Sequence, residues 1–222
     1  TKGIPIVRTN ADEISLGDAD RVRTRVIAAL ADASKPVWEH LQAIETATWR
    51  LAQGQQTPDT FEPVYGLDPG PFIRHLGHCI GAHGRVALLQ NFLSYRRFIF
   101  DLKVDSGDPR WASLEDHLKD WGPAYERWLA PHEDALRPLH LRYLAHRAFT
   151  PYAAPKGDLR SAFGRNTHVF ATSLRYAAAL GATLERPVDV AVMKVAIGAA
   201  EYFYRSKTVP HENMPWFEAE PG

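Results

Sequence analysis

The helical spacing of apolar residues, which extends along nearly the whole chain of 222 residues, most constrains the fold. Between residues 18 and 53, apolar side chains recur every three or four positions, as at Val22, Val26 and Leu30 and again at Leu41 and Ile44. That spacing puts them on one face of an α-helix. No stretch alternates polar and apolar residues between hairpin turns, as paired strands would, and no internal repeat is present. The sequence therefore predicts an all-α fold.

Prolines and glycines set the expected helix boundaries in the first two thirds of the chain. Pro36 is expected to start a second helix, and a connector rich in both residue types covers residues 54–71. Pro71 should begin a long helix to about Asp101, and a turn at 105–109 should follow it. The next helix should carry one aromatic and leucine face, and Pro131 should open another helix with a leucine-rich face. The first face comprises Trp111, Leu114, Leu118, Trp121, Tyr125 and Trp128, and the second Leu136, Leu139, Leu141 and Leu144.

The last third of the chain predicts two more helices. A second proline-containing loop covers residues 150–158, and Asp158 is the expected N-cap of the helix after it. That helix should end at Gly181, because glycine commonly adopts the left-handed conformation that terminates a helix. Pro187 should open a final helix through Tyr204, which is apolar on almost all sides and so should be buried. We expect one helical domain over residues 1–222.

Composition excludes several classes of function. Lysine plus arginine equals aspartate plus glutamate, 26 of each, so no overall charge attracts nucleic acid or a membrane surface. The single cysteine, Cys79, rules out an internal disulfide and reads as core packing. No run of 18 apolar residues and no signal-peptide pattern occurs. We therefore expect a cytoplasmic protein that binds neither nucleic acid nor membranes.

His168 is the first candidate for a functional residue. It lies midway along its expected helix, and Gly164, Ala171 and Thr172 lie one turn to either side. Small residues at these spacings leave a shallow dish around the imidazole, on which a flat cofactor can rest with the histidine as an axial iron ligand. The same pattern also describes an ordinary histidine beside small packing residues. The pattern by itself leaves both interpretations open.

Further candidates lie on two other expected helices and in the last loop. His75, His78 and His83 share one helix, where His83 lies about 140° around the axis from His78, so the three do not face one pocket. His83 continues the apolar face and is the one expected to point inward. Arg142 suits a carboxylate clamp, or else a surface arginine, and His211 either lines a cavity mouth or is exposed. The chain has no Glu-x-x-His pair for a di-iron bundle, no phosphate loop and no Cys-x-x-Cys-His haem-attachment motif.

Three segments resemble, in the same order, the tryptophan 2,3-dioxygenase superfamily of histidine-ligated haem enzymes, over roughly residues 65–217. The segment His83-Gly-Arg-Val-Ala-Leu-Leu-Gln90 is similar to the helix of the distal histidine. Leu139-His-Leu-Arg142-Tyr143 is similar to the helix whose arginine holds the substrate carboxylate, and Arg165-Asn-Thr-His168 is similar to the helix of the proximal histidine. The resemblance implies a helical bundle of that type enclosing a haem.

Two departures point to one branch of this superfamily. Ala182-Thr-Leu-Glu-Arg-Pro187 follows Gly181 where the dioxygenases carry a loop rich in glycine, threonine and serine, and the spacing from Arg142 to His168 is shorter. Both features resemble the compact haem-dependent L-tyrosine hydroxylases of bacterial antibiotic biosynthesis. A related methyltyrosine hydroxylase attaches haem through His-x-x-x-Cys, whereas this chain has His211-Glu-Asn-Met-Pro215, so non-covalent haem b is expected.

The resemblance implies a monooxygenase that converts L-tyrosine to L-DOPA with hydrogen peroxide, or with dioxygen and a reductant. It implies His168 as iron ligand and His83 as distal acid–base, with His78 as the alternative distal residue. Haem contacts would come from Gly164, Arg165 and Thr172, and substrate contacts from Arg142, His78, Tyr143 and His211. A homodimer is also expected. The alternatives are a haem dioxygenase acting on tryptophan or another aromatic amino acid, and a non-enzymatic helical binding module.

Overall fold

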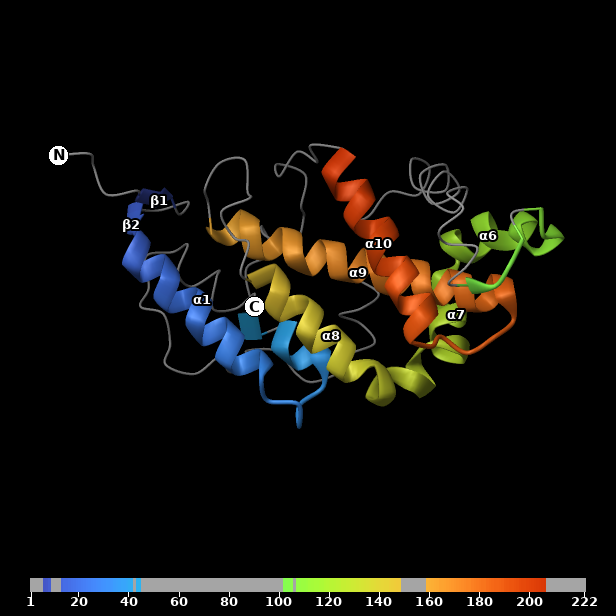
Figure 1. Ribbon diagram of the computed structural model, residues 1–222, viewed down its shortest axis with the longest axis horizontal. Helices are drawn as coiled ribbons and strands as arrows, with labels where there is room; N and C mark the ends of the chain where they lie inside the picture. The colour runs from blue at the N-terminus through green and yellow to red at the C-terminus, as the bar shows by residue number, and fades with distance from the viewer. Residues whose placement is uncertain are drawn as a thin grey trace, which may run out of the picture. The chain divides into compact units, whose positions relative to one another are not determined.

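The fold was analysed in a computed structural model, which describes residues 6–8, 13–41, 43–44, 102–105, 107–148 and 159–206. Side chains are described at positions 21, 23–41, 43–44, 102–105, 107–148 and 169–202. Helices account for most of this part of the chain, which confirms the predicted all-α character (Figure 1). None of the described helices is both long and apolar enough to span a bilayer. The expected helix from Pro71 to Asp101 lies outside the described residues.

The Cα positions separate into two compact units. One comprises Thr1–Phe72, Arg137–Thr167 and Trp216–Gly222, and the other Ile73–Leu136 and His168–Pro215. The unit boundaries at 136/137 and at 167/168 fall inside continuous helices rather than in linkers. The expectation of a single domain stays a prediction.

The first unit contains the one element that the periodicity analysis did not anticipate. The strands β1 (Ile6–Arg8) and β2 (Glu13–Ser15) pair antiparallel, with Val7 opposite Ile14. Three residues are too few to display a period-two pattern, so the sequence gives no recognisable signal. Helix α1 (Leu16–Leu30) follows directly, and residues 37–41 are helical after Pro36, as expected.

The turn between these helices is fixed from two sides. The ring nitrogen Nε2 of His40 lies 2.9 Å from the carbonyl oxygen of Asp32, and the Arg137 guanidinium donates to the carbonyl of Ala33 at 3.2 Å. Ser34 donates to the Asp32 carboxylate through both its N–H and its hydroxyl. Side-chain contacts therefore satisfy the backbone of this turn, and they connect it to Arg137 of α8 (Glu133–Ala148), which belongs to the same unit.

The expected helix carrying Trp111 and Trp128 is divided into three pieces. A 3-10 helix, η1 (Pro109–Ser113), precedes α6 (Leu114–Lys119) and α7 (Trp121–Trp128). The break falls at Asp120, whose backbone leaves the helical region with φ −107° and ψ 64°. Pro123 explains the break, because its ring would clash with the carbonyl of Lys119 in a continuous helix, whereas proline is accepted in a first turn. A short 3-10 helix, η2 (Ala130–His132), contains Pro131 and leads into α8.

Helix α9 (Leu159–Leu184, orange in Figure 1) begins immediately after Asp158, as predicted, but it does not end at Gly181. The left-handed residue is Glu185, with φ 52°. The N–H of Arg186 donates to the carbonyl of Gly181 at 3.0 Å, and the N–H of Glu185 donates to that of Ala182 at 3.2 Å. This pair of bonds is a Schellman motif, with glutamate in the position where glycine is usual.

Gly181 instead permits close packing. A Cβ atom there would lie 2.9 Å from Val188 Cγ2, 3.0 Å from Trp128 Cβ and 3.2 Å from the carbonyl oxygen of Arg186. The expected role of Gly181 as the helix stop is therefore wrong. The constraint on this residue comes from α7 and from the segment after α9, which lie too close to leave room for a side chain.

The last helix, α10 (Val190–Ser206), starts three residues after the predicted Pro187. Asp189 caps it, because its carboxylate accepts the N–H of Val192 at 2.9 Å. The side chains of Val192, Met193, Val195, Ala196, Ala199 and Ala200 are buried, whereas Val190 and Tyr202 are exposed. The prediction of burial is thus confirmed for one side of the helix only.

Replacing Gly181 by alanine should destabilise the protein by about 1–3 kcal/mol, because the added methyl group meets a Cβ atom and a backbone carbonyl that cannot move independently. Gly107→Ala is the matched control. A Cβ at Gly107 meets only Asp105 Oδ1, at 3.6 Å, so its effect should stay within about 0.5 kcal/mol. Urea unfolding of both variants measures the difference, and equal stabilities would contradict the packing role.

Candidate functional site

His168 occupies a backbone position within α9, at the edge of the longest buried stretch of the described chain. Every described residue from Val169 to Leu184 on this helix is buried. Gly164 and Arg165 belong to the same helix, and their side chains, like that of His168, lie outside the described ones. A helix buried on all sides must be covered by other segments around its whole circumference. The candidate ligand position therefore stands next to the interior rather than on a surface helix.

Two residues of the expected haem dish are described. Ala171 and Thr172 lie three and four positions after His168, and both are buried, Thr172 with 0% of its surface exposed. Their small size meets the requirement for a flat group beside the ligand position. Complete burial of Thr172 also means that protein atoms fill the space over it. A haem can occupy this face only if those atoms are displaced.

A buried arginine stands on the same side of α9 as His168. Arg175 is seven residues further on, so ideal helix geometry places it within about 20° of the same angular position. Only 6% of its surface is exposed. Its Nε donates to the carbonyl oxygen of Leu118 at 2.7 Å, and Nη2 donates to the same oxygen. Burial lowers the pKa of Arg175, yet arginine stays charged at any ordinary pH. The sequence analysis missed this residue.

The contacts of Arg175 and Gly181 show how α6 and α7 follow α9. Leu118 of α6 meets Arg175, Ala124 of α7 joins the core cluster of Ala178 and Ala182, and Trp128 meets Gly181. Along these contacts, residue numbers increase both in the segment 118–128 and in α9. The segment 118–128 therefore runs in the same direction as α9, and its early residues lie toward the His168 end.

An aromatic cluster with an acidic partner lies on α7. Tyr125 is half-buried, its ring meets that of Trp121 edge-on with centroids 5.7 Å apart, and its hydroxyl donates to Glu133 Oε1 at 2.5 Å. Burial, followed by the negative charge of Glu133, raises the pKa of the Tyr125 phenol well above its ordinary value. Arg127 stacks over the ring of Trp128, 4.8 Å from its centroid. The aromatic face of this segment was predicted, but its pairing with Glu133 was not.

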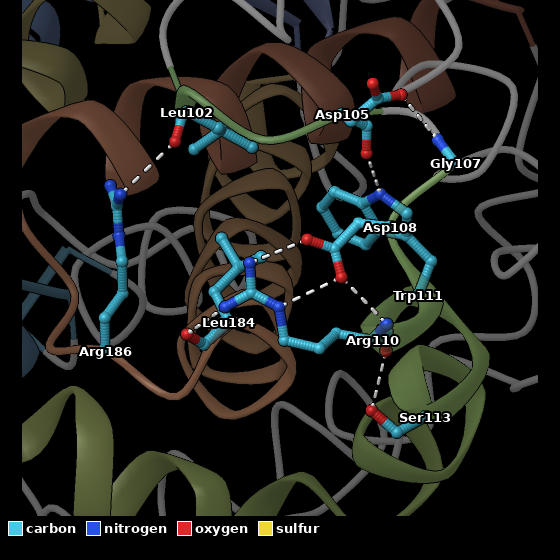
Figure 2. A network of polar contacts seen from close by, with 9 residues as sticks. All are labelled: Leu102, Asp105, Gly107, Asp108, Arg110, Trp111, Ser113, Leu184 and Arg186. Atoms are coloured by element: carbon cyan, nitrogen blue, oxygen red, sulfur yellow. Dashed lines mark hydrogen bonds and ion pairs between the residues drawn. The ribbon is translucent and has the colours of Figure 1, made fainter.

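A second polar network joins the segment before α6 to the end of α9 (Figure 2). Asp108 caps η1 and binds the Arg110 guanidinium through both carboxylate oxygens, which lowers the pKa of Asp108 to about 2. Arg110 also donates to the carbonyl of Leu184 at 3.0 Å, and Arg186 donates to the carbonyl of Leu102 at 3.3 Å. Each arginine thus satisfies a backbone carbonyl of the other's segment. The network therefore stabilises the fold by joining the two segments.

Helix α8 carries the predicted substrate-binding arginine. Arg142 is exposed and Tyr143 half-buried, while Leu141 and Leu144 are buried. Arg142 belongs to the first compact unit and His168 to the second. The other predicted residues, His78, His83 and His211, lie outside the described part of the chain. The structure therefore does not test whether the site residues come together.

His140 of α8 is a buried titratable group that the sequence analysis did not select. It exposes 2% of its surface, and burial lowers its pKa to about 4. Among the residues that the structure describes, no three His, Cys, Asp or Glu side chains gather into a metal-binding group.

The chain was compared with known proteins at three levels. No protein-family model matches it, and neither a curated protein nor a solved structure gives a significant match.

The burial of His140 predicts a pH-dependent stability. Its pKa falls from the ordinary value of 6.5 to about 4, so the unfolded chain binds a proton in this window while the folded protein does not. The free energy of unfolding should therefore be highest above pH 6.5 and should fall, by up to about 3 kcal/mol, as the pH decreases toward 4. Denaturant unfolding at a series of pH values measures this slope.

The slope can be assigned with two variants. His140→Leu should flatten it, and part should remain because burial also lowers the pKa of His40. His146→Leu is the matched control on the same helix, since His146 is exposed. An unchanged slope in His140→Leu would show that the buried imidazole is not its source.

Proposed function

We propose that this protein is a haem-dependent monooxygenase that hydroxylates L-tyrosine at the ring carbon next to the phenol, giving L-DOPA. The observation that carries the proposal is the position of His168 beside the buried stretch of α9, with the small residues Ala171 and Thr172 in the following turn. The resemblance of three ordered segments to histidine-ligated haem enzymes supplies the rest of its support.

In this proposal α9 holds the cofactor. His168 would bind the iron of a non-covalent haem b, and Gly164, Arg165 and Thr172 would help to hold the cofactor. When bound, the haem supplies the activation of hydrogen peroxide, or of dioxygen with a reductant. With peroxide, one of its oxygen atoms enters the ring and the other leaves as water, so L-tyrosine and H₂O₂ give L-DOPA and H₂O.

The remaining residues would position the substrate and move its proton. Arg142 is exposed, so a substrate carboxylate can reach its guanidinium without displacing protein, and a two-pronged contact would fix the ring in place. His83, or His78 in its stead, would accept and return the phenol proton, for which an imidazole pKa is suited. Tyr143 and His211 would line the substrate site. The proposal also includes a homodimer, which sedimentation of the purified protein tests.

Hemin titration tests the iron ligand. Wild-type protein should gain a Soret band at one hemin per chain, and His168→Ala should lose it, because the bond from the histidine to iron would supply much of the affinity. His146→Ala is the matched control, since it removes an exposed histidine and should leave binding unchanged. Full hemin occupancy in His168→Ala would exclude His168 as the ligand. No binding to the wild type would favour a helical binding module instead of an enzyme.

Arg142 is tested by comparing two substrates. Arg142→Ala should reduce kcat/KM for L-tyrosine by roughly a hundredfold, as expected for the loss of a charged pair of about 3 kcal/mol. Tyramine, which lacks the carboxylate, should be affected little. Arg142→Lys keeps the charge but loses the planar fork, so it should restore only part of the activity. Equal losses for both substrates would remove the clamp role. Conversion of tryptophan to N-formylkynurenine would favour a dioxygenase.

A further inference from the structure

Tyr125 has the surroundings of a redox-active tyrosine. A phenol is oxidised at moderate potential only if its proton leaves together with the electron, so it needs a base within hydrogen-bond reach. Glu133 Oε1 accepts the Tyr125 hydroxyl at 2.5 Å. Glu133 is the first residue of α8, eight positions after Tyr125, so the pairing is set by the turn through η2. The acceptor is therefore held in place by the backbone and not by a flexible surface loop.

Trp121 lies directly beside this pair. Its ring is buried and meets Tyr125 edge-on at 5.7 Å between centroids, with an interplanar angle of 69°. Trp128, at the other end of α7, differs in charge environment, because the Arg127 guanidinium stacks over its ring at 4.8 Å. A cation at that distance disfavours a further positive charge on the indole. Within this helix, Trp121 and Tyr125 are therefore easier to oxidise than Trp128.

The direction of the cluster follows from its packing on α9. Leu118 meets Arg175, Ala124 meets Ala178, and Trp128 meets Gly181, so the segment runs parallel to α9. Trp121 consequently lies nearer to the His168 end of α9 than Tyr125 does. From the candidate cofactor position Trp121 therefore comes first and Tyr125 second, and Glu133 is the hydrogen-bond acceptor of Tyr125.

We propose that Tyr125 is a one-electron donor whose phenol proton passes to Glu133, and that Trp121 relays the electron toward the His168 end of α9. In each step Tyr125 loses one electron and one proton, the O–H bond breaks, and Glu133 Oε1 becomes protonated. Two such electrons, together with two protons taken from solvent, reduce one hydrogen peroxide to two waters. A thiolate donates one electron to the tyrosyl radical and becomes a thiyl radical, and Glu133 returns its proton to the phenol.

The peroxide reaction as the source of oxidising equivalents rests on the proposed function. In the absence of substrate, the oxidising species would then oxidise Tyr125 specifically, and the other aromatic side chains would be spared. The redox pair itself needs no haem, because any strong one-electron oxidant can act on it.

Flash photolysis tests the pair in the haem-free full-length protein. A ruthenium tris-bipyridine and persulfate mixture generates the oxidant, and transient absorption follows the neutral tyrosyl radical. The expected signal includes a component whose rate does not depend on buffer base concentration, since Glu133 takes the proton internally. Tyr125→Phe, which keeps the ring, should abolish this component. Tyr202→Phe is the matched control, because it removes a tyrosine that is 39% exposed and lies outside this pair, so the component should remain.

Two further variants separate the roles. Glu133→Gln should slow the component on the order of a hundredfold and make it buffer-dependent, as expected for loss of an internal base. Trp121→Phe should slow it while leaving it buffer-independent. Persistence of the component in Tyr125→Phe, or an unchanged rate in Glu133→Gln, would overturn the proposal, provided that circular dichroism shows native helix content.

The photolysis result and hemin binding can fail separately. A buffer-independent radical together with no hemin binding would keep the redox pair and overturn the haem proposal. Hemin binding by His168 without that radical would keep the haem proposal and overturn the redox pair.

Discussion

The close approach of α7 to the small-residue face of α9 is the contact on which the rest of the second unit depends. With no side chain at Gly181, Trp128 and Val188 come within packing distance of the helix. The N–H of Val188 then reaches the carbonyl of Trp128 at 2.9 Å, which fixes the chain between α9 and α10. The Schellman turn at Glu185 follows from that path. A local choice of residue size thus decides where one helix ends and how the next begins.

Helix α9 links this packing to the candidate chemistry. Its second half is tied to α6 and α7 by Arg175 and by the alanine cluster, and its first half carries His168. Burying the guanidinium of Arg175 is costly unless its donors are satisfied, and the carbonyl of Leu118 near the end of α6 meets two of them. This bond fixes the rotation of α9 about its axis. It therefore also fixes the angular position of residue 168 within the unit.

Signals that act within one turn of a helix were readable from the sequence, and signals that depend on distant partners were not. Pro36 and Asp158 marked helix starts, because their effects are local. Gly181 misled, because glycine serves both as a helix stop and as a packing residue, and only its contact with Trp128 distinguishes the two. Arg175 was missed because no spacing rule connects it with its partner Leu118, 57 residues earlier. The Tyr125–Glu133 pair was missed because its two residues lie on different helices, separated by a turn that contains proline. Of the candidate site, the sequence could supply residues but not their convergence.

The aromatic residues along α7 would be a hazard to the protein if the proposed oxidising chemistry takes place nearby. Burial of aromatic rings along α7 stabilises the helix pair, yet buried tryptophan and tyrosine side chains are the first to lose electrons near a strong oxidant. The chain treats its three α7 aromatics differently: a cation covers Trp128, while Tyr125 has a base for its proton. Packing requires neither of these neighbours, because Tyr125 and Trp128 already contact the alanine cluster with part of their surface. If oxidising chemistry takes place at the His168 end of α9, this asymmetry makes Tyr125, and not Trp128, the residue that is oxidised.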